Sequence, residues 1–328
     1  MRKEPIVAVA TIERETGLPV TMTSRRLLAV ALFVLGAGAA AVALLGPLVF
    51  EVVRHHASES AVNQIAGGDI AGLFLAAPIS VAAGFLVLRG HVAGPVLALA
   101  PAVYGLYTYT QLTLGGDFVR YEGNSERFFL LYAGLFVVSG FVAIRAWTAI
   151  DPNRFPPMSP RLGKGLAYLL LGVAVFLVVG LHLPTLIDAW RDNPTSTAYL
   201  DDPGVFWIVK LMDFAIVAPV LVVIAIGILR GARWAGEIVY GAVGWFALLG
   251  TSVAGMAIVM QATDDPSATI ANTIAFGAFA VAGLAVAVLA VRPLFVEPLR
   301  DAGADGSTPP VEEPRAEETR VPVAAGNG

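Results

Sequence analysis

The stretch 205-VFWIVKLMDFAIVAPVLVVIAIGIL-229 decides the fold class of this chain. Only Lys210 and Asp213 interrupt it with charge. A helix of about 20 apolar residues crosses a hydrocarbon core about 30 Å thick. Because lipid cannot form hydrogen bonds with backbone N–H and C=O groups, a continuous apolar run of this length predicts a membrane-spanning helix.

Working outward from this stretch, seven more apolar runs have a similar length. Together the eight runs cover residues 27–50, 70–88, 92–114, 128–146, 166–183, 205–229, 236–260 and 269–291. Apolar residues make up 57% of the 328-residue chain and charged residues only 14%, which is too apolar for a soluble domain. The sequence therefore predicts an all-α membrane protein with eight transmembrane helices.

The basic residues predict which side each loop faces, because loops rich in Lys and Arg stay in the cytoplasm. With the N-terminus inside, 16 of the 21 Lys and Arg residues fall on the cytoplasmic side. Both termini are then cytoplasmic. We expect a multi-pass protein of the cell (plasma) membrane with the lipid bilayer as a partner. The formal net charge of −4 argues against a nucleic-acid partner.

The order of short motifs recurs in the two halves of the chain. Ala77-Pro78-Ile79, Leu88-Arg89-Gly90 and Ala93-Gly94 match Ala218-Pro219-Val220, Leu229-Arg230-Gly231 and Ala235-Gly236, at offsets of 141 and then 142 residues. Residues 47–51 similarly resemble residues 184–188. Chance matches among residues as common as Leu, Gly and Ala are the alternative. Duplication predicts two parallel four-helix repeats, each with a proline kink in its second helix.

The apolar runs and the repeat together predict the organisation of the chain. It comprises a mobile cytoplasmic tail (1–26), a first four-helix repeat (27–148), a cytoplasmic linker (149–164), a second four-helix repeat (165–292) and a disordered acidic cytoplasmic tail (293–328). The last segment is rich in Pro, Gly, Ala and Glu. It therefore cannot bury enough apolar surface to offset the entropy lost on ordering.

Four short segments resemble those of a known group of proteins. They are Gly68-Asp69-Ile70, Tyr104-Gly105-Leu106-Tyr107-Thr108-Tyr109, Phe128-Phe129-Leu130-Leu131-Tyr132 and Leu211-Met212-Asp213-Phe214-Ala215. The chain is similar, over most of residues 27–292, to a family of uncharacterised prokaryotic multi-pass membrane proteins. The resemblance implies the membrane fold and prominent roles for Asp69 and Asp213, and it implies no activity.

Three of the ionisable side chains in or near the predicted spans need an explanation, because a charge at mid-helix costs about 2.5 to 3.5 kcal/mol. Lys210 and Asp213 are three positions apart on one helix face. They are expected to neutralise each other, either as a structural ion pair or as a site for a zwitterion or a proton. Asp69 lies nine residues before Pro78 and Asp213 six before Pro219, which places both carboxyl groups on faces toward the repeat interface.

Further polar residues are expected on the outward side of the membrane. They predict an outward-facing polar cavity, although ordinary enrichment of polar residues at helix ends is the alternative. The loop 117–127 either covers that cavity, with Arg127 recognising a carboxylate, or is a hydrated connector. The candidate ligand-binding residues are Asp69, Tyr107, Arg127, His182, Lys210 and Asp213.

Glu51, His55 and Glu59 follow one another at i, i+4 spacing. A helix continuing past residue 50 would place these possible metal ligands on one face, with His182 in reach; a hydrated helix extension is the alternative. Residues 250–252, Gly-Thr-Ser, resemble part of a serine nucleophile motif but lack its strand-turn-helix context. No catalytic residue, resident metal or cofactor is therefore expected.

Three classes of function remain open. Non-catalytic binding of a small ligand, a lipid or a partner membrane subunit is favoured. A small-molecule or proton-coupled transporter is the alternative, and an intramembrane enzyme is the second alternative. Duplication and proline-containing spans favour transport, whereas the scarcity of polar residues on the cytoplasmic side leaves no visible exit path.

Overall fold

The computed structural model describes residues 22–151, 154 and 158–296. Most of both predicted tails, and residues 152–153 and 155–157 of the predicted linker, lie outside the described residues. Within this part of the chain there are helices and loops and no strand. The prediction of an all-helical fold is confirmed.

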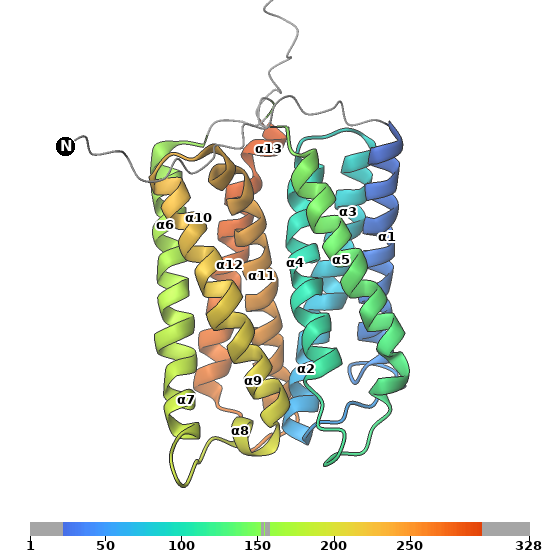
Figure 1. The fold of residues 1–328 in the computed structure, drawn as a ribbon, viewed down its shortest axis with the longest axis vertical. Helices are drawn as coiled ribbons and strands as arrows, with labels where there is room; N and C mark the ends of the chain where they lie inside the picture. Colours follow the sequence, from blue (N-terminus) through green and yellow to red (C-terminus); the bar gives the residue numbers. More distant parts are fainter. Residues whose placement is uncertain (1–21, 152–153, 155–157, 297–328) are drawn as a thin grey trace, which may run out of the picture.

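The first half of the described chain forms a bundle of long helices, on the right in Figure 1. Its elements are α1 (Met22–Leu45), α2 (Glu59–Ala71), the π-helix η1 (Gly72–Ala76), α3 (Ala77–Leu88), α4 (Ala93–Leu114), the 3₁₀ helix η2 (Ser125–Phe128) and α5 (Phe129–Ala149). Because α2, η1 and α3 follow one another without a break, they form one long helix with a π-turn inside it.

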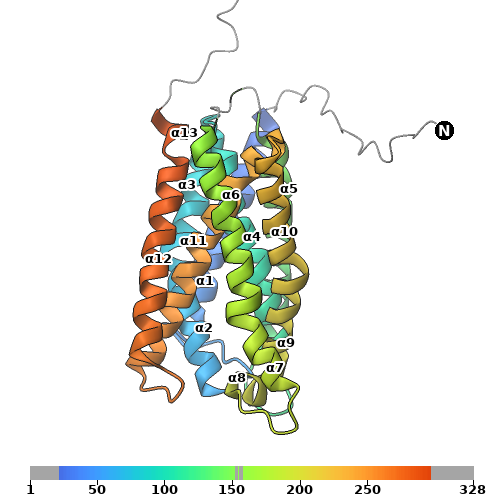
Figure 2. The ribbon, with the colours of Figure 1, turned by 90° about the vertical axis from the view of Figure 1, so that its left-hand side faces the viewer.

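The second half forms a similar bundle beside the first, seen from a second direction in Figure 2. Its elements are α6 (Pro160–Val175), the π-helix η3 (Phe176–His182), α7 (Leu183–Ala189), α8 (Thr197–Asp201), α9 (Pro203–Met212), the π-helix η4 (Asp213–Val217), α10 (Ala218–Leu229), α11 (Arg233–Ala262), α12 (Ile270–Val291) and α13 (Pro293–Val296). Two more long helices, α6–η3–α7 and α9–η4–α10, therefore contain a π-turn.

Seven helices in the described part of the chain are long and apolar enough to cross a membrane. They are α1, α2–η1–α3, η2–α5, α6–η3–α7, α9–η4–α10, α11 and the helix that continues from α12 into α13. A further long helix, α4, lies among them, but tyrosines and threonines in its second half make it less apolar. These features indicate a multi-pass membrane protein.

The exposed side chains of α12 indicate whether water or lipid surrounds this part of the bundle. This helix packs chiefly on α11, and Ala280 and Ala290 are the only buried residues of its fully described span. Ile274, Val281 and Val288 are 67%, 68% and 63% exposed. Leaving such side chains in water costs about 1.5 to 3 kcal/mol each relative to burial. A hydrocarbon environment removes that cost.

The end of the first helix differs from the prediction. We predicted a span over residues 27–50, but α1 begins at Met22 and ends at Leu45, and the chain then turns through Gly46 and Pro47. Pro184, in contrast, lies inside the long helix α6–η3–α7. The similar segments 47–51 and 184–188 therefore have different conformations.

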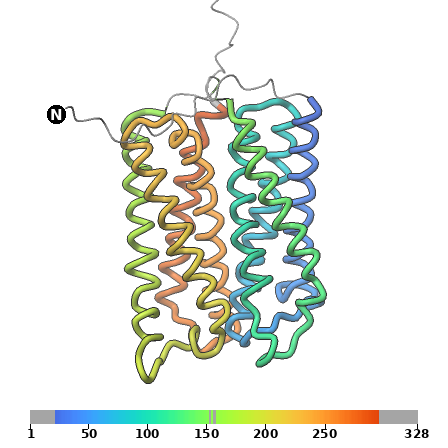
Figure 3. Tube along the Cα trace, viewed as in Figure 1, coloured from blue at the N-terminus to red at the C-terminus, as the bar shows by residue number. Residues whose placement is uncertain are grey.

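Matching pairs of helices pack together in the two halves, as the traces in Figure 3 show. In the first half α3 packs on α1 and α4, and α4 packs on α5. In the second half α10 packs on α6 and α11, and α11 packs on α12. The order of helices and these three contacts are thus the same in both halves, whereas the packing of α1 on α5 has no counterpart between α6 and α12.

The helices α3 and α10 also end in the same way. Gly90 and Gly231 follow the last helical turns with φ of 67° and 72°, in the left-handed region that glycine adopts most easily. In both helices the residue after this glycine donates its N–H to the carbonyl oxygen five residues earlier, which makes a Schellman motif. The repeated Arg-Gly pairs therefore stop both helices at matching points.

Each π-helix ends two residues before a proline. The prolines are Pro78 after η1, Pro184 after η3 and Pro219 after η4. A proline lacks an N–H, and its ring clashes with the carbonyl group four residues earlier, so a wider turn accommodates it. The π-turns before Pro78 and Pro219 lie at matching positions in the two halves, where we predicted kinks. The one before Pro184 was not predicted.

The helix α11 joins the two halves by packing on both α2 and α4. Its contact with α2 is close, because a Cβ on Gly67 would lie 2.3 Å from the backbone of Met256. The corresponding contact, of α9 with α4, is much less extensive. The helices therefore follow one another in a similar order in the two halves. However, α2 packs more extensively on the other half than α9 does.

Candidate functional site in a cavity between the two halves

A cavity of about 650 Å³ lies between the two halves of the bundle. Its wall takes residues from α2 and α4 of the first half and from η3, α9, η4, α11 and α12 of the second. On α4 the lining begins at Tyr104 and on α11 at Phe246, so the cavity lies in the part of the bundle away from the start of α1 (Figure 1). Its volume is typical of pockets that hold small molecules.

Asp213, the first residue of η4, links the two halves within the cavity wall. Its Oδ1 accepts a hydrogen bond from the Tyr107 hydroxyl of α4 at 3.0 Å. Its Oδ2 lies 2.6 Å from His182 Nε2 of η3. All three side chains are buried. Because both carboxyl oxygens have partners, Asp213 holds the wall together and is not a free carboxylate.

Lys210 and Asp213 form no salt bridge, although the charge of Asp213 still acts on Lys210. Lys210 is 7% exposed, and its ammonium nitrogen lies 3.3 Å from the centroid of the Phe206 ring. Among the described residues there is no salt bridge to Lys210. The direct ion pair is missing because the hydrogen-bond partners of Asp213 come from other helices, which spacing along one helix cannot reveal.

Asp69 of α2 is a buried carboxyl group with an unsatisfied oxygen. It is 8% exposed, and its Oδ2 has no hydrogen-bond partner within the described chain. Gly46 leaves room for this carboxyl group, since a Cβ there would lie 2.6 Å from Oδ2. The nearby Tyr104 hydroxyl donates to the Gly68 carbonyl at 3.1 Å. A buried polar group without a partner is costly, and this oxygen lies against Gly46, which does not line the cavity.

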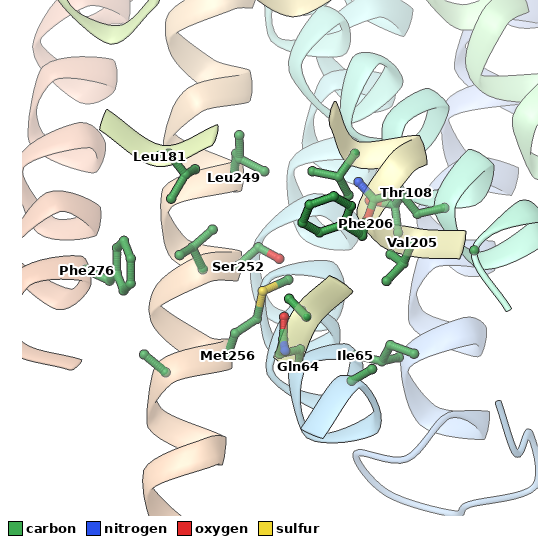
Figure 4. A pocket seen from close by; sticks show the side chains of 18 of the residues that line it. Gln64, Ile65, Thr108, Leu181, Val205, Phe206, Leu249, Ser252, Met256 and Phe276 are labelled. Carbon is green, nitrogen blue, oxygen red and sulfur yellow. The ribbon is translucent and has the colours of Figure 1, made fainter. Parts of the chain in front are cut away.

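Aliphatic and aromatic side chains form most of the wall, which is less polar than the sequence predicts. Figure 4 shows Leu249 and Met256 of α11, with Phe276 of α12 to one side and Phe206 of α9 to the other. Ser252 also lies on this face of α11, within a continuous helix and without the turn that a nucleophilic serine motif requires. The cavity suits a ligand with an apolar body.

Loops of both halves join at the end of the bundle beside the cavity. Ser58, the N-cap of α2, donates its backbone N–H to Asp202 Oδ1 at 2.8 Å and its hydroxyl to Oδ2. Arg120 and Tyr121, from the predicted covering loop, donate to backbone carbonyls of the two residues before Asp202. The starts of α2 and α9 are thereby tied together.

Two adjacent histidines on the cavity wall have opposite electrostatic environments. His56 Nε2 lies 2.7 Å from Glu126 Oε2, and its Nδ1 lies 2.7 Å from the Tyr121 carbonyl oxygen. The hydrogen bond with Glu126, and then that with Tyr121, raise the pKa of His56. Burial, followed by the neighbouring charge of His56, lowers the pKa of His55 to about 4. At neutral pH His55 is therefore uncharged.

Two sequence-based expectations place residues differently from the structure. Arg127 does not line the cavity; its side chain is 78% exposed and lies 4.0 Å from Glu126. Glu51, His55 and Glu59 do not share a helix, because α1 ends at Leu45 and α2 begins only at Glu59. The predicted helical stacking of metal ligands is therefore wrong. The described residues contain no group of three or more His, Cys, Asp or Glu that could hold a metal ion.

The remaining candidates come together in one place. The cavity wall contains Asp69, Tyr107, His182, Lys210 and Asp213. Sequence reasoning missed Phe206, although its position four residues before Lys210 puts both on one helix face. Comparisons with protein-family models, curated proteins and solved structures give no match to this chain. The function is therefore inferred from the cavity and its residues.

Proposed function

We propose that the chain is an integral protein of the cell membrane with eight spans, of which α4 is the eighth, and with both termini cytoplasmic. Three observations support this proposal. The helix α4 lies among the seven apolar helices, the basic residues gather on one predicted side, and α1 starts at the same end of the bundle at which α13 lies. Membership of the multi-pass family that the sequence resembles is part of the same proposal.

The two halves are proposed to be copies of one four-helix unit. The matching order of helix contacts, the matching Schellman motifs and the π-turns before Pro78 and Pro219 support duplication. Because each copy has an even number of spans, the copies are parallel. The cavity then lies at the interface between repeats, a frequent place for binding sites in such proteins.

The function that this geometry supports best is non-catalytic binding of a small amphiphilic molecule, which reaches the cavity from outside the cell. The observation that carries this proposal is the cavity of about 650 Å³ between the two halves, whose mostly apolar wall contains Asp69 and Lys210. Its apolar side chains suit the body of such a molecule, and its buried polar groups suit a head group.

Transport of the same molecule is a second candidate, favoured by one observation. Two of the three helices that contain π-turns, α6–η3–α7 and α9–η4–α10, contribute π-helix residues to the cavity wall, and π-turns often occur at functional sites. Against transport, the lining of α4 and α11 comes from one half of each helix. Catalysis has less support, because His182 is bonded to Asp213 and not to a serine hydroxyl.

Binding is tested by filling the cavity. The purified full chain is screened for thermal shifts with amphiphilic amines, acids and zwitterions, alongside Val253→Trp in the cavity wall and Val281→Trp on the exposed face of α12. A ligand of the cavity should shift the wild type and Val281→Trp, and fail to shift Val253→Trp. If no compound shifts the wild type, or if Val253→Trp binds as well, the proposal is wrong.

The same variants separate binding from transport. The wild-type chain is reconstituted into proteoliposomes, and the identified ligand is followed across the membrane. Binding without flux above that of protein-free liposomes supports the first function. Flux that is lost in Val253→Trp and kept in Val281→Trp supports transport.

A further inference from the structure

One acidic and one basic side chain of the cavity wall form no salt bridge. Asp69 comes from α2 of the first half, and Lys210 comes from α9 of the second. Both are more than nine-tenths buried. No salt bridge to either one exists in the described residues. Neither group therefore has the direct ion pair that a buried charge normally has.

The other buried carboxyl groups of the wall already have partners. Asp213 is bonded by Tyr107 and His182, and Asp202 is bonded by Ser58. A ligand that replaced those bonds would gain little. Asp69 and Lys210 are thus one acidic and one basic group to which an incoming polar molecule adds interactions without breaking a salt bridge.

The surroundings of Lys210 allow its ammonium group to bind an anionic group of a ligand. Its ammonium rests on the Phe206 ring, a cation–π contact that stabilises a charge less than a carboxylate does. Three N–H donors of an ammonium point in different directions, so this contact leaves donors for a second partner. The carboxyl group of Asp69 correspondingly accepts hydrogen bonds from an ammonium group.

We propose that the cavity recognises a zwitterion with an apolar substituent, whose ammonium group binds Asp69 and whose carboxylate or phosphate binds Lys210. This inference rests on the binding function proposed above and names its ligand class. Both charges of the ligand and both charges of the wall are then paired, and the apolar substituent lies against the aromatic and aliphatic wall. Two sources carry this chemistry: a free apolar amino acid or the head group of a zwitterionic lipid.

Three matched probes test this recognition on the full chain in detergent. Phenylalanine carries both charges, phenethylamine lacks the carboxylate, and phenylpropionate lacks the ammonium. The wild type should bind phenylalanine at least about tenfold more tightly than either fragment, since each lost charge-assisted bond costs about 1.4 kcal/mol or more. Equal affinity for all three probes would overturn the proposal.

Charge-removing variants give a pattern that a folding defect does not. Lys210→Met should bind phenylalanine no better than phenethylamine, whereas Asp69→Asn should bind it no better than phenylpropionate. Arg127→Met, which removes an exposed charge outside the cavity, should keep the wild-type preference. A uniform loss of binding for all probes in both cavity variants would contradict the assignment of the two ends.

Measurements in lipid vesicles show whether the zwitterion is a lipid head group or a free molecule. Wild type and both cavity variants are reconstituted in vesicles with and without phosphatidylethanolamine, against phosphatidylglycerol as the anionic control. Stabilisation by phosphatidylethanolamine that both variants lose assigns the zwitterion to a lipid, and binding of phenylalanine alone assigns it to a free molecule. If neither binds while other amphiphiles still bind in a way that Val253→Trp blocks, the ligand class is wrong and the binding function stands.

Discussion

Asp69 and Lys210 occupy matching positions in the two halves of the chain. Each lies three residues before the first residue of a π-helix, Gly72 of η1 or Asp213 of η4. They are 141 residues apart, the offset that separates Pro78 from Pro219. The same position relative to the π-helix thus holds a carboxyl group in the first half and an amino group in the second, and both residues line one cavity.

Asp213 and Tyr107 should be energetically coupled. Tyr107→Phe removes one buried hydrogen bond and should lower the free energy of unfolding by about 1 kcal/mol. Asp213→Asn, which disturbs the bonds to both Tyr107 and His182, should cost about 1 to 3 kcal/mol. A double-mutant cycle measured by chemical denaturation in detergent should give a coupling of about 0.5 kcal/mol or more. Additive losses would show that the hydrogen bond does not contribute.

The close crossing of α2 and α11 should not tolerate a side chain. Gly67→Ala places a Cβ at 2.3 Å from the Met256 backbone and should cost about 1 to 3 kcal/mol through overpacking. Gly134→Ala on α5 is the matched control, because nothing lies within 4 Å of its Cβ. It should be neutral or stabilise by up to about 1 kcal/mol through helix propensity. The melting temperatures of the two variants test this prediction. Equal values would contradict the close contact between α2 and α11.

Acid should destabilise the protein through His55. Its folded-state pKa is about 4, below the ordinary value of 6.5, so the unfolded chain binds its proton first and stability falls as the pH drops from about 6.5 to about 4. The loss amounts to about 3 kcal/mol at 1.36 kcal/mol per pKa unit. His55→Gln should flatten this part of the pH profile of thermal stability. His56 has a raised pKa, so His56→Gln should change the decline above pH 6.5 instead.

Cysteine labelling should place α4 across the membrane. The chain contains 0 cysteines, so each introduced cysteine reports alone. Val119→Cys, at a position 99% exposed after α4, should react with a membrane-impermeant maleimide in intact cells. Arg89→Cys, before α4, should react only after the cells are permeabilised. Labelling of both positions from the same side would show that α4 does not span the membrane.

The sequence was sufficient for the helices because each apolar run is long and little interrupted. It was less sufficient for their ends: residues 48–50 remain apolar after α1 has stopped at Leu45, so hydropathy alone placed the end too late. Turn geometry at Gly46 and Pro47 decides that boundary.

The candidate site was predictable only in part. Buried ionisable residues are rare in apolar helices, which identified Asp69, Lys210 and Asp213 from the sequence. Their partners could not be identified in this way, because the bonds of Asp213 to His182 and Tyr107 join positions 31 and 106 residues away. Arg127 shows the converse error: a charge in a nearby loop points into solvent and not toward the cavity.

The π-turns of η1 and η4 set the direction in which the helices before them face. A π-turn holds roughly one residue more than an α-turn, and one residue corresponds to about 100° of rotation in an α-helix. Deleting a single residue from 72–76 or 213–217 would therefore swing α2 or α9 by about a quarter of a revolution and aim Asp69 or Lys210 away from its present neighbours. Two small irregularities of winding, one in each half, orient an acidic and a basic side chain toward a common space.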